Sequence, residues 1–265
     1  MPKNLLYQED LLDEEIYEQF LPQEDQEPDP LLPFLDDGTI TEVIGEVKSG
    51  KEGTVFCCRA NPSLGVDLVA AKVFRSRNQR TFRNQAVYRE GVVILNKHDE
   101  RAVKRKSEWG RTFEEASWKY HEYEVLRTLY RAGADVPKPV KLSEHTLLME
   151  YIGDEAEAAP KLQETRLERA EARPLFDQIM SNIELFLRLD MVHGDLSAYN
   201  VLYWRGGIKI IDFPQAVDAR TNRNAVPLLQ RDLKNICQHF ARYGIVADPE
   251  AVGRRLWRQY MRAQL

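Results

Sequence analysis

The chain has 265 residues, 30% of them charged and 43% hydrophobic, and a formal net charge of −5 at pH 7. This length suits one large domain or a two-lobed one with a sizeable core. No run approaches the roughly 18 apolar residues of a membrane span, and the N-terminal residues lack the apolar segment of a secretory signal. We therefore expect neither a membrane protein nor a secreted one. The three cysteines, Cys57, Cys58 and Cys237, show no metal-ligand spacing, so we expect buried, reduced thiols in a cytoplasmic protein.

The first 37 residues predict an acidic, partly helical leader. Apolar residues at helical spacing indicate one short helix (Leu11, Leu12, Ile16 and Phe20), and prolines then predict extended chain (Pro22, Pro28, Pro30 and Pro33). Residues 8 to 37 are rich in Asp and Glu, whereas residues 75 to 111 are rich in Arg and Lys. Such like-charge blocks are usually solvated or mobile. An intramolecular contact between the two blocks and an RNA contact by the basic block both remain open alternatives.

Three predicted strands and a glycine-rich turn follow the leader. The strands cover residues 39 to 47, 54 to 59 and 67 to 74, and the turn Lys48-Ser49-Gly50-Lys51-Glu52-Gly53 joins the first two. This turn nearly matches a P-loop, but it lacks the hydroxyl after the lysine and it enters a strand rather than a helix. It is either an ordinary hairpin turn or the phosphate-covering loop of kinases, with backbone N–H groups and the Ser49 hydroxyl facing phosphate. The catalytic motif further along the chain favours the second interpretation.

A lysine and a glutamate are each predicted on a buried face. Alternation along the third strand places Ala70, Lys72 and Phe74 on one face. Residues 114 to 132 predict a helix, and Glu122 lies within its apolar stripe, which consists of Trp118, Val125, Leu126 and Leu129. A surface lysine on an edge strand is the simpler alternative. Because an unpaired buried charge is costly for either residue, we predict an ion pair between Lys72 and Glu122.

The next stretch predicts an insert and the end of the first lobe. Residues from about 75 to 113 are predicted to form a flexible basic insert, which could become ordered when a nucleotide or a partner binds. Two strands are expected at residues 140 to 143 and 146 to 152, after which the composition changes from strand-rich to helix-rich. We therefore predict an N-lobe over residues 38 to 153 and a helical C-lobe over residues 154 to 265.

The most informative stretch runs from residue 192 to residue 213. Two β-rich runs flank Arg205-Gly206-Gly207, which predicts a tight hairpin. The hairpin brings together its outer ends, one carrying Asp195 and Asn200 and the other carrying Asp212. Their oxygen atoms suit a hard cation such as Mg²⁺ that holds nucleotide phosphates. The spacing H-x-D-x-x-x-x-N before a strand and Asp-Phe is typical of kinase-like phosphotransfer, with Asp195 as base or positioner. Loop capping by Asp195 and Asn200 is the alternative.

Helical spacing of apolar residues predicts helices on both sides of this stretch. One begins at Pro174 and runs to Met191, and its core stripe consists of Leu175, Ile179, Ile183, Phe186 and Leu187. Residues 227 to 243 repeat the pattern with Leu229, Leu233, Ile236, Cys237 and Phe240. Asp248-Pro249 starts a last helix whose arginines favour a solvated face over a nucleic-acid surface (Arg254, Arg255, Arg258 and Arg262).

Together these residues resemble the RIO-type atypical serine/threonine protein kinases. The resemblance runs from about Gly45 to Phe240, and its most specific motifs are Ser49-Gly50-Lys51-Glu52 and Asp212-Phe213-Pro214-Gln215. It is also carried by Lys72, Trp118 with Glu122, Arg131-Ala132-Gly133, Met149-Glu150-Tyr151-Ile152-Gly153, His193-Gly194-Asp195-Leu196-Ser197-Ala198-Tyr199-Asn200 and Arg231-Asp232.

The resemblance implies an α+β, two-lobed protein-kinase-like fold that binds ATP with Mg²⁺ or Mn²⁺. The implied nucleotide-binding residues are Ser49, Gly50, Lys51, Val55, Ala70, Lys72, Met149, Glu150, Ile152 and Leu202. The implied catalytic residues are Lys72, Glu122, Asp195 and Asp212, and the implied metal ligands are Asn200 and Asp212. It further implies a ribosome-linked role with a protein or ribosomal-particle partner, and Asp212 as a phosphoacceptor. No oligomeric state is implied, and no winged-helix domain is expected before residue 38.

Departures from ordinary protein kinases bear on the expected activity. Gly194 replaces the arginine of H-R-D, and Pro214 replaces the glycine of D-F-G. The chain between Asp212 and the helix near Pro227 is too short for a long activation segment. Slow ATP hydrolysis or autophosphorylation is therefore favoured over broad peptide phosphorylation.

Two other functions compete with this interpretation. A small-molecule phosphotransferase of the aminoglycoside or choline kinase type shares His-Gly-Asp-x-x-x-x-Asn and a later Ile-Asp-Phe, but the Ser49 loop and Pro214-Gln215 argue against it. A nucleotide-switched, non-enzymatic assembly factor is the second. The presence of Lys72, Asp195, Asn200 and Asp212 argues against an inactive site.

Overall fold

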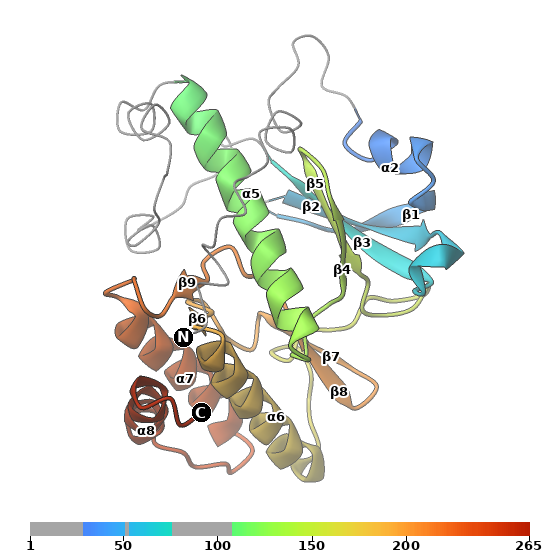
Figure 1. The fold of residues 1–265 in the computed structure, drawn as a ribbon. Helices are drawn as coiled ribbons and strands as arrows, with labels where there is room; N and C mark the ends of the chain where they lie inside the picture. Colours follow the sequence, from blue (N-terminus) through green and yellow to red (C-terminus); the bar gives the residue numbers. More distant parts are fainter. Residues whose placement is uncertain (1–28, 51–52, 76–107) are drawn as a thin grey trace. The chain divides into compact units, whose positions relative to one another are not determined.

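The computed structural model describes residues 29 to 50, 53 to 75 and 108 to 265 (Figure 1), and side chains of the long helix α5 from residue 117 onward. The chain divides into two compact units. Of the described residues, the first unit holds those up to 75, 108 to 127 and 138 to 158, and the second holds 128 to 137 and 159 to 265. The sequence places the lobe boundary near Gly153, whereas the units divide between Ala158 and Ala159. Among the helices of the described ranges, none is both long and apolar enough to cross a membrane.

The first unit is built on a five-stranded antiparallel sheet in the order β1-β2-β3-β5-β4. The strands are β1 (Ile40–Ser49), β2 (Gly53–Ala60), β3 (Leu68–Phe74), β4 (Pro139–Leu142) and β5 (Thr146–Glu150), and a 3₁₀ turn at Pro62–Leu64 joins β2 to β3. All five predicted strands are therefore confirmed, with ends that differ by one or two residues. Strand β1 is exposed along nearly its whole length, whereas consecutive residues of β3 are buried, so that β3 is covered on both faces.

A short helix completes the core of the first unit. The sequence predicts extended chain through Pro33, but residues Leu32–Asp36 form helix α2, with the proline in its first turn where no N–H is needed. That prediction is wrong because Leu31 and Phe34 are apolar anchors. They are buried in one cluster with Ile40, Cys58, Val69 and Leu148. The helix predicted around Leu11 to Phe20 lies outside the described residues.

Helix α5 (Glu108–Arg131) is longer than the sequence predicts. Residues 108 to 113, predicted as part of the insert, are helical, and the rest of the basic insert up to residue 107 lies outside the described residues. Val125, Leu126 and Leu129 are buried as expected. The Trp118 ring packs edge-to-face on Phe74, with 5.5 Å between the ring centroids.

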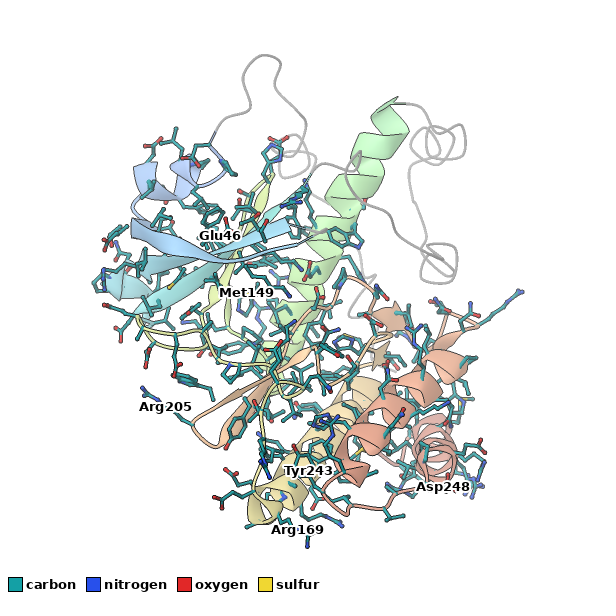
Figure 2. All side chains as sticks on the ribbon, turned by 180° about the vertical axis from the view of Figure 1, so that it is seen from behind. Glu46, Met149, Arg169, Arg205, Tyr243 and Asp248 are labelled. Carbon is teal, nitrogen blue, oxygen red and sulfur yellow. The ribbon has the colours of Figure 1, made fainter. Side chains whose placement is uncertain are left out.

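The second unit consists of three helices and two small antiparallel sheets. The helices are α6 (Arg169–Arg188), α7 (Ala225–Ala241) and α8 (Pro249–Met261). One sheet pairs β6 (Met191–Val192) with β9 (Val217–Asp218), and the other is the hairpin of β7 (Val201–Trp204) and β8 (Gly207–Ile210). Figure 2 shows Arg205 at the tip of that hairpin. The predicted core stripes of α6 and α7 are buried, and the arginines of α8 are exposed, as predicted.

Two local details differ from or agree with expectation in this unit. Helix α6 begins at Arg169, so Pro174 lies inside the helix rather than at its first turn. The earlier start is supported by the Glu168 backbone N–H, which donates to the Glu171 carboxylate at 3.0 Å. Helix α8 begins where predicted, with the Asp248 carboxylate accepting from the Glu250 N–H at 2.9 Å. All three cysteines are buried and free of disulfides, as predicted.

Candidate active site

The predicted ion pair of Lys72 and Glu122 is present in the first unit. Lys72 Nζ lies 2.6 Å from Glu122 Oε1, and the two side chains are only 10% and 4% exposed. Strand β3 lies between β2 and β5, and Lys72 is paired with Val55 on one side and Leu147 on the other. Its ammonium also lies 5.5 Å from the centroid of the Phe74 ring. The sheet therefore holds one buried cation at a fixed position, and the helix supplies its anion.

The glycine-rich turn closes the hairpin of β1 and β2 as predicted. The Gly50 N–H donates to Gly53 O at 2.9 Å, and Ser49 Oγ accepts from the Arg75 guanidinium at 2.5 Å. A Cβ on Gly53 would lie 2.2 Å from Val73 O, so only glycine lets β2 approach β3 here. The sequence indicated neither this close approach nor the role of Arg75. Lys51 lies outside the described residues.

The residues expected to hold the nucleotide base lie on the central strands of the same sheet. Ala70 pairs with both Cys57 and Met149, and Glu150 ends β5 just before Ile152. The Glu150 carboxylate accepts from the Lys138 N–H at 3.0 Å, and Glu150 N–H donates to Lys138 O at 2.7 Å. The Glu150 side chain thus fixes the chain before β4. The nucleotide-binding roles of these residues stay predictions.

In the second unit, the β7–β8 hairpin brings together the two ends of residues 192 to 213, the predicted catalytic stretch. Trp204 pairs with Gly207, so the turn has two residues, Arg205 and Gly206, whose φ values are 49° and 84°. Positive φ at both turn positions is typical of a type I′ hairpin. The predicted three-residue turn is therefore wrong by one residue. At the open end, Ile211 N–H donates to Asn200 O at 3.0 Å, which holds the backbone before Asp212 against Asn200.

The predicted catalytic loop, residues 193 to 200, orients one of its own side chains by a hydrogen bond to its own backbone. Asn200 Nδ2 donates to Asp195 O at 2.9 Å. Asp212 adopts a φ of 72°, which is unfavourable for a residue other than glycine. Leu202, in β7, pairs with Lys209 of β8. The structure thus brings Asp195, Asn200 and the Asp212 backbone into one small region, as the sequence predicts.

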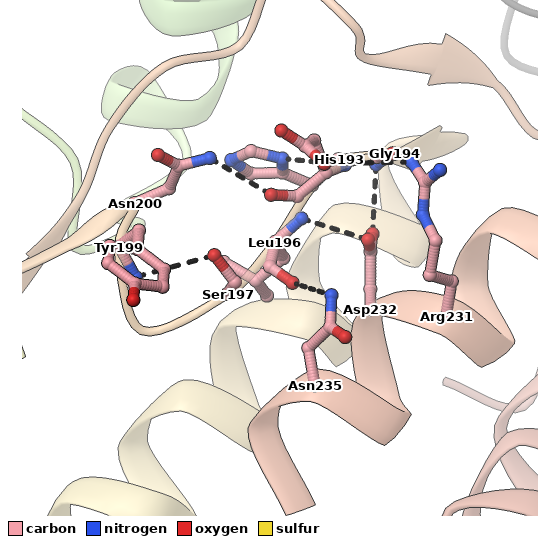
Figure 3. A network of polar contacts seen from close by, with 10 residues as sticks. His193, Gly194, Leu196, Ser197, Tyr199, Asn200, Arg231, Asp232 and Asn235 are labelled. Carbon is pink, nitrogen blue, oxygen red and sulfur yellow. Dashed lines mark hydrogen bonds and ion pairs between the residues drawn. The ribbon is translucent and has the colours of Figure 1, made fainter. Parts of the chain in front are cut away.

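A buried carboxylate on α7 holds the catalytic loop from below (Figure 3). Asp232 accepts from the N–H groups of Gly194 and Leu196, each at 2.8 Å. The Arg231 guanidinium donates to Gly194 O, and Asn235 Nδ2 donates to Leu196 O at 3.0 Å. Burial raises the pKa of Asp232 to about 7, although the two N–H groups and Arg231 favour its charged form. In the sequence, Arg231-Asp232 stands out only as part of a family motif, and the position of an acid beside the apolar stripe of α7 is the one signal of an anchor.

Residues 54–252 match the family model of the RIO domain. A RIO-type serine/threonine-protein kinase Rio1 of Haloferax volcanii is 32% identical over 223 residues, which cover 83% of this chain and 70% of that protein. The chain belongs to the RIO kinase family. Human serine/threonine-protein kinase RIO1 is 29% identical over 216 residues, covering 81% of this chain but 36% of that protein. The match to RIO1 of Schizosaccharomyces pombe spans 41% of that protein.

A solved structure confirms the fold class. A Rio2 kinase of Chaetomium thermophilum, solved as an ADP/Mg²⁺-phosphoaspartate complex, resembles this chain with a TM-score of 0.59 and 19% identity, over 88% of this chain and 69% of that one. The α+β, kinase-like fold and the RIO family predicted from the sequence are therefore both confirmed. As predicted, the RIO domain also has a short connection after Asp212: α7 already begins at Ala225.

The general base expected of a RIO kinase is accessible. The Asp195 side chain is 52% exposed, and its Oδ1 lies 3.8 Å from the Arg231 guanidinium. Partial burial of its carboxyl group raises the pKa of Asp195, and the charge of Asp212 acts in the same direction. The positive charge of Arg231 and the hydrogen bond of Asn200 oppose this shift. A base with a raised pKa and an open path to solvent suits proton removal from an incoming acceptor.

His193 is buried and neutral beside this loop. The Asp195 N–H donates to Nδ1 at 3.3 Å, so Nε2 carries the hydrogen and donates to Ile211 O at 3.2 Å. The ring also packs on Phe213, with 4.7 Å between centroids. Burial lowers the pKa of His193 to about 4. The imidazole therefore acts as a fixed strut between the two ends of the catalytic stretch.

A pH dependence of stability follows for His193. Below a pH of about 6.5 the unfolded chain takes up a proton at this residue and the folded protein does not, so the free energy of unfolding falls as the pH drops toward 4. We expect His193→Gln, which can still donate to Ile211 O, to lose less stability than the wild type between pH 7 and pH 5. Urea denaturation at both pH values measures this difference. His239 and Asp232 also have shifted pKa values, but they are present in both proteins and their contributions cancel in the comparison. An identical pH dependence of stability in wild type and His193→Gln would contradict the prediction.

Proposed function

We propose that this RIO domain binds ATP with Mg²⁺ and transfers or hydrolyses the γ-phosphoryl group. The observation that carries the proposal is the buried ion pair of Lys72 and Glu122. A charged lysine in the middle of a sheet is costly to maintain for folding alone, whereas in kinases the same pairing positions a lysine toward nucleotide phosphates. A role in binding nucleotide phosphates would therefore explain why both charges are buried at this position. The names of the relatives, serine/threonine-protein kinases, support the same reaction.

The donor atoms of the second unit fit Mg²⁺ as far as their chemistry goes. Asn200 offers an amide oxygen and Asp212 a carboxylate, which are the hard ligands this ion prefers. Within the described ranges there is no group of three or more His, Cys, Asp or Glu residues able to hold a metal ion. The ion would therefore need nucleotide phosphates and water to complete its shell, as Mg²⁺ commonly does in kinases. When bound, it would neutralise charge on the transferred phosphoryl group.

Two acceptors are consistent with this site. With a serine or threonine hydroxyl, Asp195 takes the proton while the oxygen forms a bond to the γ-phosphorus and the bond to the ADP oxygen breaks. With Asp212 as acceptor, a carboxylate oxygen forms the new bond, ADP leaves, and water later cleaves the acyl phosphate. The phosphoaspartate in the Rio2 kinase complex supports the second route for this family. We propose the second route for ATP hydrolysis and the first for transfer to protein.

Labelled ATP tests the function directly. The full chain is incubated with γ-³²P-ATP and Mg²⁺, and we expect formation of ADP together with label on the protein. Label that hydroxylamine removes, and that is absent in Asp212→Asn, supports the aspartyl phosphate, whereas acid-stable label on serine or threonine supports kinase activity. No ADP above the buffer control would overturn the proposal. Label on a small molecule added from a cell extract would instead support a small-molecule phosphotransferase.

The wider role is proposed on family resemblance. We propose a ribosome-linked function with a protein or ribosomal-particle partner, and an RNA contact through residues 75 to 111, of which Arg75 and the helical backbone of residues 108 to 111 are described. The three buried free thiols support a reducing, cytoplasmic compartment. A pull-down with the tagged full chain, scored for ribosomal particles before and after RNase treatment, tests the role and separates protein from RNA contacts.

A further inference from the structure

An aromatic ring lies exposed beside the candidate base in the second unit. Tyr199 is 54% exposed, although Ala198 next to it is only 3% exposed. The backbone of Tyr199 is held within the loop, because its N–H donates to Ser197 Oγ at 3.3 Å. The ring itself has a cationic neighbour, the Lys161 ammonium, which lies 5.7 Å from the ring centroid. Figure 3 shows Tyr199 on the same loop turn as Ser197 and Asn200. An exposed ring with buried neighbours is accessible to a ligand or partner, and its apolar face is able to pack against one.

The segment that carries Lys161 is fastened to the catalytic loop. Gln163 N–H donates to Ala198 O at 3.0 Å, and Leu162 N–H donates to Val201 O at 2.8 Å. The backbone of Lys161 forms an isolated antiparallel β-bridge with that of Leu202. The backbone of Lys161 is therefore held beside the loop that carries Tyr199, and the residue as a whole is half-buried.

One face of α7 adds further positive charge along the same loop. Residues three, four, seven and eleven positions apart share a helix face, and Arg231, Lys234, Asn235, Gln238 and Arg242 follow this spacing. Three of them touch the loop or its neighbouring segment: Arg231 donates to Gly194 O, Asn235 donates to Leu196 O at 3.0 Å, and Arg242 donates to Gln163 Oε1 at 3.4 Å. Lys234 and Arg242 are exposed. Asp232, the acid on α7, is turned inward, with both its oxygens accepting loop N–H groups.

We infer that Tyr199, Lys161, Lys234 and Arg242 form an acceptor surface that binds a protein segment with acidic residues around the target serine or threonine. The inference rests on the proposed phosphotransfer at Asp195 and names its substrate class. Carboxylates of the segment meet the three cations, and an apolar or aromatic side chain packs on the Tyr199 ring. A single-stranded nucleic acid fits less well, because proteins that bind such ligands stack successive bases on several aromatic side chains, whereas the proposed surface offers one exposed ring, that of Tyr199.

A charge-swap experiment tests the acceptor surface. The substrates are a serine peptide flanked by glutamates and the same peptide flanked by lysines, and the readout is the ratio of their kcat/KM values, which cancels changes in the fraction of active protein. We expect the wild type to favour the glutamate peptide, and Lys161→Glu/Lys234→Glu to reduce the ratio about tenfold, because each reversed charge changes attraction into repulsion. The matched control is Arg255→Glu/Arg258→Glu on α8, which changes the net charge equally and should leave the ratio unaltered.

The ring is tested separately. Tyr199→Ala should raise KM for the glutamate peptide about tenfold, whereas Tyr199→Phe, which keeps the ring and loses the hydroxyl, should stay within about twofold. An unchanged ratio in the double variant, an equal change in the α8 control, or loss of binding to a labelled RNA oligomer with no change in peptide kinetics would overturn the inference.

Failure of the proposed function would be recognised independently. If neither peptide is phosphorylated, fluorescence anisotropy of the same labelled peptides measures binding without turnover. Tighter binding of the glutamate peptide, lost in Lys161→Glu/Lys234→Glu, would support the acceptor surface although the enzyme had failed. Equal binding of both peptides would overturn the acceptor surface whatever the enzyme does.

Discussion

Asp195→Asn is expected to slow transfer to a serine acceptor by about 1,000-fold, because the amide cannot take the hydroxyl proton. Phosphorylation of Asp212 has a different requirement, since a carboxylate nucleophile has no proton to lose. In the same variant we therefore expect hydroxylamine-labile label to form and then persist, because activation of the hydrolytic water is lost. Single-turnover measurements with γ-³²P-ATP, followed for both serine-bound and hydroxylamine-labile label, separate the two effects.

The control for Asp195→Asn is another exposed aspartate of the same unit. Asp177 forms an exposed ion pair with Arg173 on α6, and Asp177→Asn should leave both reactions within about twofold of the wild type. Asp212→Asn in the Asp195→Asn background should abolish the persistent label. Equal loss of both kinds of label in Asp195→Asn would mean that this residue positions the nucleotide or the loop and is no base.

The second large effect concerns the buried ion pair of the first unit. Lys72→Met leaves the Glu122 carboxylate in the interior, where its side chain is 4% exposed, without its cation. We expect the free energy of unfolding to fall by about 3 kcal/mol, together with loss of ATP turnover. Adding Glu122→Leu removes the second charge, so Lys72→Met/Glu122→Leu should recover most of the stability and none of the turnover. Urea denaturation and ADP release on the same preparations measure the two quantities.

An exposed lysine on the same sheet provides the comparison. Lys141 of β4 pairs with Asp37, and these side chains are 48% and 38% exposed. Lys141→Met should cost less than about 1 kcal/mol and leave turnover intact. If the double variant of Lys72 and Glu122 were as unstable as Lys72→Met alone, the cost would arise from packing around β3, and the electrostatic explanation would be wrong.

The sequence predicted those parts of the fold in which local pattern and burial agree. The strands around Lys72 and the apolar stripes of α6 and α7 were found from periodicity, because each element buries one face or runs through the core. Helix α2 does not follow from the sequence pattern, because prolines within a short segment favour extended chain, and the burial of Leu31 and Phe34 depends on strands far along the sequence. The start of α6 differs from the prediction for a related reason: Pro174 favours a helix boundary in the sequence, whereas the structure accommodates it inside the helix.

The site shows the same division between local and distant information. The Lys72–Glu122 pair followed from two separate anomalies, a lysine and a glutamate on apolar faces, and each explains the other. The hairpin that joins Asn200 to the backbone before Asp212 followed from its turn residues. The anchoring of the catalytic loop by Asp232 did not follow, because its partners are backbone N–H groups about 36 to 38 residues earlier, and no side-chain pattern marks them.

Helix α2 has a practical consequence for where this domain can be cut. The family match begins at residue 54 and ends at residue 252, inside β2 and inside α8. A fragment with those limits would lose the edge strand β1, and the apolar surface under Phe34, including Cys58 and Leu148, would be left facing water. Thr146 Oγ1 also donates to Pro30 O at 3.0 Å, so the ordered chain reaches back at least that far. The smallest fragment that folds should therefore begin no later than Asp29, because removal of β1 leaves the edge of β2 unpaired and open to aggregation. It should also keep all of α8, because a cut at residue 252 removes the buried Leu256.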